Sequence, residues 1–214
     1  MKIQCITVGM LEENCYLVVD EETNHAILVD PGDEGERIVQ AIQRSGATLD
    51  AIWLTHAHLD HIGGINAVRR AFEVPVKLHA ADLPYYDRLS ARAAETYGIP
   101  WDQPTAVPEL ISDDDTLMCG NAEFSVMHVP GHAPGHVAFL RDGVALSGDL
   151  LFAGSIGRTD LPLADPHAMD RSLEKFAGLP AESVVYPGHG PHTTIARELE
   201  TNPFLSGRAR TLKR

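Results

Sequence analysis

The sequence predicts an α/β protein in which two β-sheets pack together and helices cover their outer faces. Each half of the chain opens with short apolar or alternating segments and continues into segments of helical periodicity. No linker, low-complexity stretch or close repeat separates the two halves. Because 214 residues are enough for one well-packed core, we expect a single domain over residues 1–214.

In the first half, three segments alternate or run apolar as strands do, and they cover residues 3–8, 15–19 and 25–29. A turn follows at Asp30-Pro31-Gly32. From Glu34 to Ser45 apolar residues recur at helical spacing, and Gly46 is suited to end that helix. We then expect a strand at 51–55, a helix near 62–72, a strand at 76–79, a helix over 82–97 and a proline-rich loop over 98–108.

The second half returns to strands, which we expect near 117–119, 122–129, 136–140 and 143–147. Gly120-Asn121 joins the first two as a tight hairpin. A helix near 168–177 ends at Gly178-Leu179-Pro180. A strand at 183–186 and a helix near 193–200 complete the elements.

The composition narrows the class of protein. Hydrophobic residues make up 44% and charged residues 22%, and no apolar run approaches membrane-spanning length. The formal net charge of −13 argues against nucleic acid or an anionic membrane as a partner. Three scattered cysteines form no CxxC pair and we expect no signal peptide, so the cytoplasm is the default compartment.

The most informative stretch is Thr55-His56-Ala57-His58-Leu59-Asp60-His61, which follows the apolar run 51–54. Imidazole nitrogen and carboxylate oxygen are the ligands that zinc or iron accepts. Burying four such side chains without a cation would be costly. The stretch therefore predicts part of a metal site, and the number of ligands indicates two ions.

Three further candidate ligands share one feature, since each follows an apolar strand and a glycine: His132, Asp149 and His189. Strand ends are where α/β proteins build their sites. A lone histidine after a strand is usually an ordinary polar residue, but four strand ends with metal-type ligands are hard to obtain by chance. Together they supply five histidines and two aspartates, enough for two metals with one bridging carboxylate.

The pattern His-x-His-x-Asp-His, then Gly-His, Gly-Asp and Gly-His, resembles the metallo-β-lactamase-fold hydrolases over essentially the whole chain. The resemblance implies a four-layer αβ/βα sandwich with the site at one edge of the two sheets. It implies a first metal held by His56, His58 and His132, and a second held by Asp60, His61 and His189. Asp149 would bridge the two metals.

Within that superfamily the chain resembles the short glyoxalase II-like (hydroxyacylglutathione hydrolase-like) branch. The resemblance rests on residues 131–136, 151–160 and 186–190. Longer members carry a C-terminal helical domain whose basic residues help to bind glutathione. We expect no such domain here, because the basic residues beyond His189 are only Arg197, Arg208, Arg210, Lys213 and Arg214. The thiol carrier of the substrate therefore stays open.

This branch implies a dinuclear metal-dependent hydrolase that cleaves S-acylglutathione-type thioesters, such as S-D-lactoylglutathione to glutathione and D-lactate. Two divalent cations, with zinc favoured and iron or manganese also acceptable, would lower the pKa of a shared water. The metal-bridging hydroxide would attack the acyl carbon, and Asp60 would also orient it. Asp60 is therefore the catalytic candidate among the ligands.

Two residues outside this set have candidate roles. Arg158 either clamps a substrate carboxylate or forms an ion pair with Asp160 or Asp165. His136, four residues after His132, is expected to form a hydrogen bond that supports a metal ligand.

Other functions remain open. The closest alternative is a mononuclear-iron persulfide dioxygenase of the same fold, whose Gly-Arg-Thr-Asp run is matched at 157–160. That family has cysteine where His136 stands and an Ala-His-Asp run where Gly188-His189-Gly190 stands. A lactonase or β-lactamase is compatible with the ligands alone. A non-catalytic metal-binding module would tolerate the loss of ligands, yet here the set is complete. The oligomeric state is not predicted.

Overall fold

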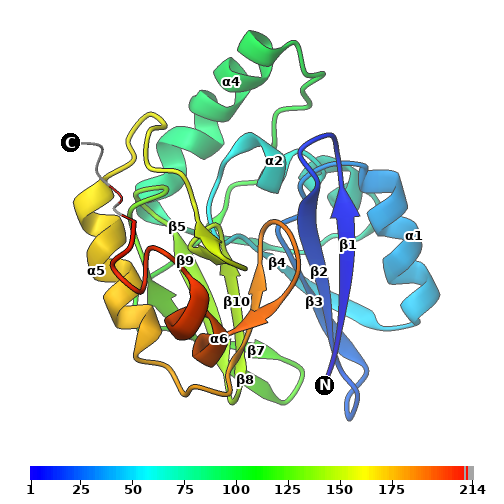
Figure 1. Cartoon of the computed structure of the whole chain (residues 1–214). Helices are drawn as coiled ribbons and strands as arrows, with labels where there is room; N and C mark the ends of the chain where they lie inside the picture. The colour runs from blue at the N-terminus through cyan, green and yellow to red at the C-terminus, as the bar shows by residue number, and fades with distance from the viewer. Residues whose placement is uncertain (210, 212–214) are drawn as a thin grey trace.

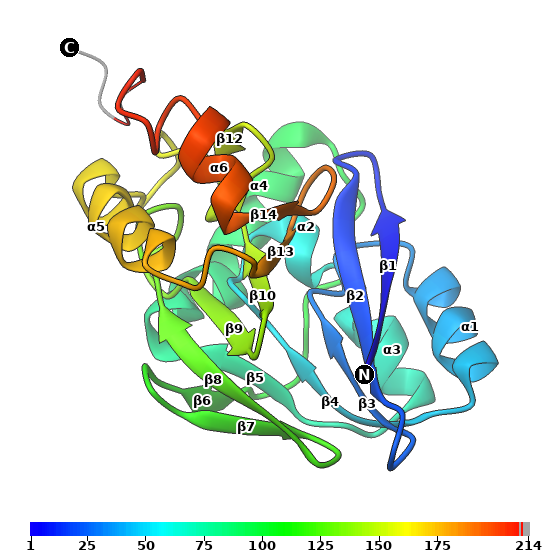
Figure 2. The same cartoon turned by 60° about the horizontal axis from the view of Figure 1, so that its bottom comes forward.

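The computed structural model describes residues 1–209 and 211, and it consists of two six-stranded sheets packed face to face. Helices lie outside each sheet, α1 on one side and α5 on the other (Figures 1 and 2). The predicted α/β class and αβ/βα sandwich are therefore confirmed. Arg210, Lys213 and Arg214 lie outside the described residues.

The first sheet has the strand order β1-β2-β3-β4-β5-β6. The first three strands are antiparallel and the last three run parallel to β3. The strands are β1 (Lys2–Val8), β2 (Glu13–Asp20), β3 (His25–Val29), β4 (Thr48–Trp53), β5 (Val76–His79) and β6 (Glu109–Ile111). The helices of this half are α1 (Gly35–Ser45), α2 (Leu59–Ile62), α3 (Ile65–Ala71) and α4 (Ser90–Tyr97).

The second sheet has the order β14-β13-β10-β9-β8-β7, and β10 and β13 are parallel. Its strands are β7 (Thr116–Cys119), β8 (Ala122–His128), β9 (Val137–Arg141), β10 (Val144–Gly148), β13 (Val184–Pro187) and β14 (Thr193–Thr194). A small hairpin joins β11 (Leu151–Phe152) to β12 (Ser155–Ile156). The helices of this half are α5 (Pro166–Ala177) and α6 (Ile195–Thr201).

Strand β2 explains how the layers form, because all eight of its residues are buried. Successive side chains of a strand point to opposite faces. Cys15 and Leu17 accordingly pack toward the helices, while Tyr16 and Val18 pack toward the second sheet. Between the sheets, Trp53 contacts aromatic rings of β8 and β9. A strand buried on both faces thus requires a layer on each side.

The segment after β4 differs from the expectation in an informative way. The strand ends at Trp53 rather than at residue 55, and the helix expected over 62–72 is divided into α2 and α3 at Gly63-Gly64. Both glycines have ordinary right-handed φ angles. A Cβ on Gly63 would lie 2.5 Å from the carbonyl oxygen of Gly32. Close approach of the 30–32 turn therefore explains why glycine stands at these two positions.

The helix expected over 82–97 is also divided. A 3-10 turn covers Ala80–Asp82, a wider π-helical turn covers Tyr85–Leu89, and α4 follows. Four strands were not predicted, because two or three residues are too few to show a periodicity. They are β6, β11, β12 and β14. Helix α5 begins earlier than expected since Asp165 caps it, accepting the N–H groups of His167 and Ala168.

Among the described residues, no helix combines the length and the apolar character needed to cross a membrane.

Candidate metal centre

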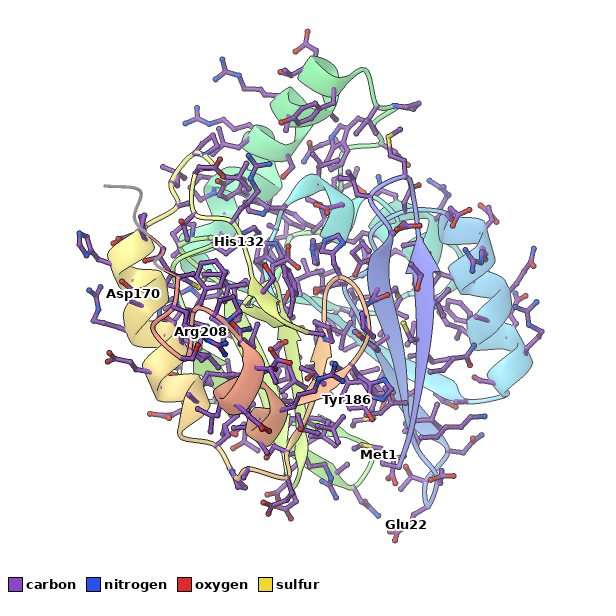
Figure 3. All side chains as sticks on the ribbon, in the orientation of Figure 1. Met1, Glu22, His132, Asp170, Tyr186 and Arg208 are labelled. Carbon is purple, nitrogen blue, oxygen red and sulfur yellow. The ribbon has the colours of Figure 1, made fainter. Side chains whose placement is uncertain are left out.

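The predicted ligands come together at one end of the two sheets. They lie on four segments that follow β4, β8, β10 and β13, as the positions of the strand ends require. Figure 3 labels His132 in this region, at the end of the molecule where α2 lies in Figure 1. Four strand ends therefore converge on one site, as the sequence predicts.

One group consists of His56, His58 and His132, all of them buried. One ring nitrogen from each lies within 4.8 Å of the others, and His58 Nδ1 is 2.8 Å from His132 Nε2. Burial lowers the pKa of His58 to about 3 and holds that of His56 well below its ordinary value. These imidazoles are therefore neutral near pH 7, which is the form that binds a metal.

A second group consists of Asp60, His61 and His189, whose ligand atoms also lie within 4.8 Å of one another. The Nε2 atom of His189 is 3.3 Å from Asp60 Oδ2. Burial disfavours the charge on Asp60, but the neighbouring His61 and His189 outweigh it and hold the pKa below its ordinary range. The carboxylate is thus ionised and available as a ligand.

Asp149 lies between the two groups. Its Oδ2 is 3.4 Å from Nε2 of His132 and 3.6 Å from Nε2 of His189, and its Oδ1 is 3.5 Å from Nε2 of His61. Burial opposes ionisation, yet the adjacent His61 holds the pKa of Asp149 well below its ordinary range. One carboxylate therefore faces both groups of nitrogen ligands.

Four of the five histidine rings are held by hydrogen bonds from their outer nitrogen, Nδ1. The acceptors are Thr55 Oγ1 for His56 (3.0 Å), Asp30 Oδ2 for His61 (3.0 Å), the Arg158 carbonyl for His132 (2.8 Å) and the Leu11 carbonyl for His189 (3.0 Å). Such bonds fix the tautomer and aim Nε2 inward. His58 is the exception, because its Nδ1 faces the group.

The inward atoms fit a cation. Among the described residues, His56 Nε2, His61 Nε2 and Asp149 Oδ1 are buried without a hydrogen-bond partner. Buried polar atoms without partners are costly, and a divalent cation would satisfy them.

Asp30 also lies within ligand distance of His56 and His61, so a third grouping is geometrically possible. Its oxygens, however, already accept the Thr55 N–H at 2.7 Å, the Thr55 hydroxyl at 2.6 Å and His61 Nδ1. Asp30 therefore holds the ligands in place. From the sequence, Asp30 was predicted only to lie in a turn.

The glycine before each later ligand is required by close packing. A Cβ on Gly188 would lie 2.2 Å from Asp149 Oδ1, and one on Gly148 would lie 2.3 Å from Thr55 Oγ1. Gly131 has a φ of +146°, and a Cβ there would lie 2.4 Å from the Cα of Met169. The backbone therefore approaches neighbouring groups closely at all three glycines.

Asp82 and Ser90 form a support that sequence reasoning missed. Asp82 accepts the N–H of Ala57 at 2.8 Å and the N–H of Gly135 at 2.5 Å, while the Ser90 hydroxyl donates to the Ala57 carbonyl at 2.6 Å. Ala57 stands between two ligands of the first group, and Gly135 follows the third. Burial raises the pKa of Asp82 to about 6. Nothing local in the sequence marks these contacts.

A second support involves the start of β2. The Asn14 amide donates to the carbonyls of Pro187 (3.1 Å) and Gly190 (2.8 Å), and the Tyr16 hydroxyl donates to Pro187 (2.7 Å). These bonds fix the loop that carries His189. Glu13 beside them is buried, and burial raises its pKa well above the ordinary value. In the sequence, the signal that could have indicated this role is the polar pair Glu13-Asn14 at the start of an apolar strand.

His136 lies beside Asp149, and Arg158 lies beside His132. The Asp149 N–H donates to His136 Nε2 at 3.0 Å, so the ring supports the backbone of a ligand. Arg158 forms a two-pronged ion pair with Asp160, at 2.7 and 3.1 Å. That is one of the two expected alternatives for Arg158, and a role in substrate binding stays a prediction.

Comparison with known proteins agrees with this site. A model of the metallo-beta-lactamase superfamily matches residues 8–189. Hydroxyacylglutathione hydrolase GloC of Haemophilus influenzae is 35% identical, over 98% of this chain and all of that protein. The probable metallo-hydrolase YqgX of Bacillus subtilis is 37% identical, over 97% and 99%. A crystal structure of TTHA1623 in a di-iron-bound form is 44% identical with a TM-score of 0.88, over 94% and 100%.

The chain therefore belongs to the metallo-β-lactamase superfamily. Its family, its metallo-hydrolase relatives and its histidine and aspartate cluster together define a metal-dependent hydrolase whose site takes divalent metal ions.

Proposed function

We propose that the protein is a dinuclear thioesterase that hydrolyses S-acylglutathione-type thioesters. In this proposal His56, His58 and His132 would hold one metal, Asp60, His61 and His189 would hold the other, and Asp149 would serve as a ligand to both. The observation that carries it is the position of Asp149, whose two oxygens face ring nitrogens of both groups at 3.4 to 3.6 Å. A site for one ion would not need a carboxylate between two complete groups.

Two bound cations would lower the pKa of water, so that hydroxide is available near neutral pH, and would polarise the acyl carbonyl. The chain's own residues prepare the site for this chemistry. The buried neutral imidazoles of the first group provide nitrogen ligands, and the ionised Asp149 and Asp60 would offset the charge of the cations. In this proposal Asp60 also orients the attacking water, since it is the carboxylate of the second group and is partly exposed.

The reaction consumes one water for each thioester. The water oxygen bonds to the acyl carbon, the carbon–sulfur bond breaks, and the products are a carboxylate and a thiol with net release of one proton. The similarity to GloC supports a thioester as the substrate. Zinc is the favoured metal, and the similarity to a di-iron protein supports iron as a second candidate.

The test is release of free thiol from S-D-lactoylglutathione by the metal-loaded protein. We expect metal-dependent hydrolysis, and we expect Asp60→Asn to lower both the turnover and the content of the second metal while leaving the fold intact. Asp142→Asn, in an exposed turn between β9 and β10, is the matched control and should behave like the wild type. A near-wild-type rate and full metal content in Asp60→Asn would remove that assignment.

Parallel measurements on the same metal-loaded protein separate the alternatives. One iron per chain, no thiol release and oxygen uptake with glutathione persulfide would indicate the dioxygenase. Turnover of lactones in preference to thioesters would indicate a lactonase.

A further inference from the structure

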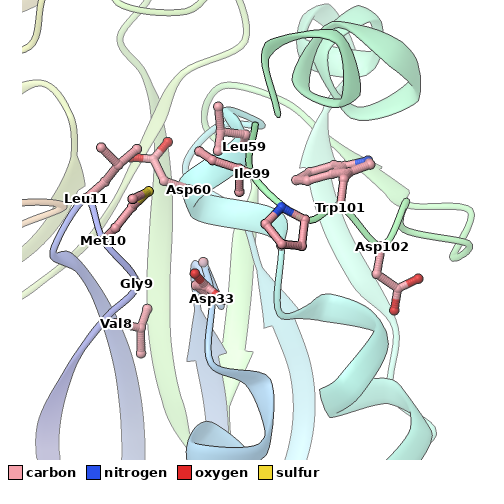
Figure 4. A pocket seen from close by; sticks show the side chains of 13 residues that line it. Val8, Gly9, Met10, Leu11, Asp33, Leu59, Asp60, Ile99, Trp101 and Asp102 are labelled. Carbon is pink, nitrogen blue, oxygen red and sulfur yellow. The ribbon is translucent and has the colours of Figure 1, made fainter. Parts of the chain in front are cut away.

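A groove lies beside the second ligand group, between the β1–β2 loop and the loop that follows α4. It is small and partly open to solvent, with a cavity volume of about 50 Å³. Because Asp60 lines the groove, the groove lies directly beside the proposed reaction centre. Figure 4 shows Met10 and Leu11 on one side, Ile99 and Trp101 on the other, and Asp33 between them.

The β1–β2 side of the groove carries exposed apolar side chains. Met10 is 77% exposed and Leu11 is 48% exposed, although burial is the usual state for such residues. The Leu11 carbonyl accepts the hydrogen bond from His189 Nδ1, so this loop is fixed against the metal centre. An apolar surface held at a reaction centre is suited to an apolar part of the substrate.

The charges in the groove all have one sign. Apart from Asp60, which is a proposed metal ligand, its charged lining residues are Asp33 and Asp102, and none of its lining residues in the described chain is Lys, Arg or His. Asp102 pairs with Arg70 at 3.2 Å, but both side chains are largely exposed and such pairs contribute little. A substrate carboxylate in this groove would therefore meet like charges.

We infer that the groove receives an uncharged, apolar acyl group of the thioester substrate. This inference rests on the proposed thioesterase function and specifies its substrate class. Glutathione itself carries two carboxylates, and the groove offers them no cation. The acyl group is consequently the part of the substrate that fits, while the carrier lies outside the groove.

The first test compares three thioesters of one thiol, namely acetyl-, butyryl- and succinylglutathione. Each buried methylene contributes about 0.8 kcal/mol, or about fourfold. Because the groove is open on one side, two added methylenes should raise kcat/KM about fivefold to fifteenfold for butyryl over acetyl. The succinyl ester, which has a similar chain length and a terminal carboxylate, should be at least about tenfold poorer than butyryl.

Two variants assign this selectivity to the groove. Met10→Ser should lower the butyryl-to-acetyl preference about threefold, whereas the control Met118→Ser, an exposed methionine on β7, should not. Asp102→Lys should narrow the butyryl-to-succinyl preference about fivefold. Its control Glu22→Lys makes the same charge change at the opposite end of the molecule from His132 (Figure 3) and should have no effect on that preference.

The outcomes separate this inference from the function beneath it. If thioesters are hydrolysed but acetyl, butyryl and succinyl esters react equally well, the groove assignment is wrong and the thioesterase proposal stands. If the metal-loaded protein hydrolyses none of them, both are wrong. If selectivity follows the expected order but Met10→Ser and Asp102→Lys leave it unchanged, the acyl group binds elsewhere.

Discussion

Replacing Asp82 by asparagine should weaken both the fold and the first metal group. The carboxylate accepts two backbone N–H groups, one from the loop of His56 and His58 and one from the loop that follows His132. An amide keeps one acceptor and turns an NH₂ group toward the other N–H. Loss of one hydrogen bond to a buried charged group, with an N–H left unpaired, should cost about 2–4 kcal/mol.

Urea unfolding of the metal-free protein measures that loss, and competition with a chelator measures metal affinity. We expect the affinity of the first metal to fall at least about tenfold, because the two loops that carry its ligands are no longer joined. Asp87→Asn, exposed on the same helical segment, is the control. If Asp82→Asn does not fold, Ser90→Ala should give a milder loss of about 1 kcal/mol. Wild-type stability and metal affinity in both variants would refute this reasoning.

Three further predictions follow from the site. His136→Leu should lower activity about tenfold because the Asp149 N–H loses its acceptor. His136→Gln should retain more activity than His136→Leu, since the glutamine amide oxygen can accept that N–H. Equal rates in the two variants would contradict this role of His136. Since the pKa of His58 falls from 6.5 to about 3 on folding, the unfolded chain binds the extra proton. The free energy of unfolding of the metal-free protein should then decrease as the pH falls below 6.5, and His58 should account for about 2 kcal/mol of that decrease at pH 5. In urea titrations, His58→Gln should remove the contribution of His58 to this pH dependence. Gly188→Ala, whose Cβ would lie 2.2 Å from Asp149 Oδ1, should lose metal by elemental analysis. The control Gly178→Ala, at a φ of −77° where a Cβ would meet only the Lys175 carbonyl oxygen at 3.2 Å, should retain it.

The candidate ligands were predictable because each follows a recognisable strand and a glycine. His132, Asp149 and His189 could be recognised because histidine and aspartate are common metal ligands. The strand before each residue fixes its position at the sheet edge. The two-sheet fold was predictable because the continuous apolar run in β2 places apolar side chains on both faces of the strand.

The supports of the site were not predictable, because they depend on contacts between distant segments. Asp82 reaches Gly135 across 53 positions of the chain, and Asn14 reaches Gly190 across 176. Neither residue type is unusual in its local sequence. The need for glycine at Gly63-Gly64 likewise depends on a distant contact, since the backbone that the pair approaches lies about thirty residues earlier, at the 30–32 turn.

The most direct test of the central proposal is a titration of chelator-stripped protein with zinc or iron, in which thiol release from S-D-lactoylglutathione and bound metal are measured together. The proposal predicts that activity rises to a plateau at two metal ions per chain, and that Asp149→Ala abolishes that plateau. A plateau of full activity at one ion per chain, or two bound ions without thiol release, would contradict it.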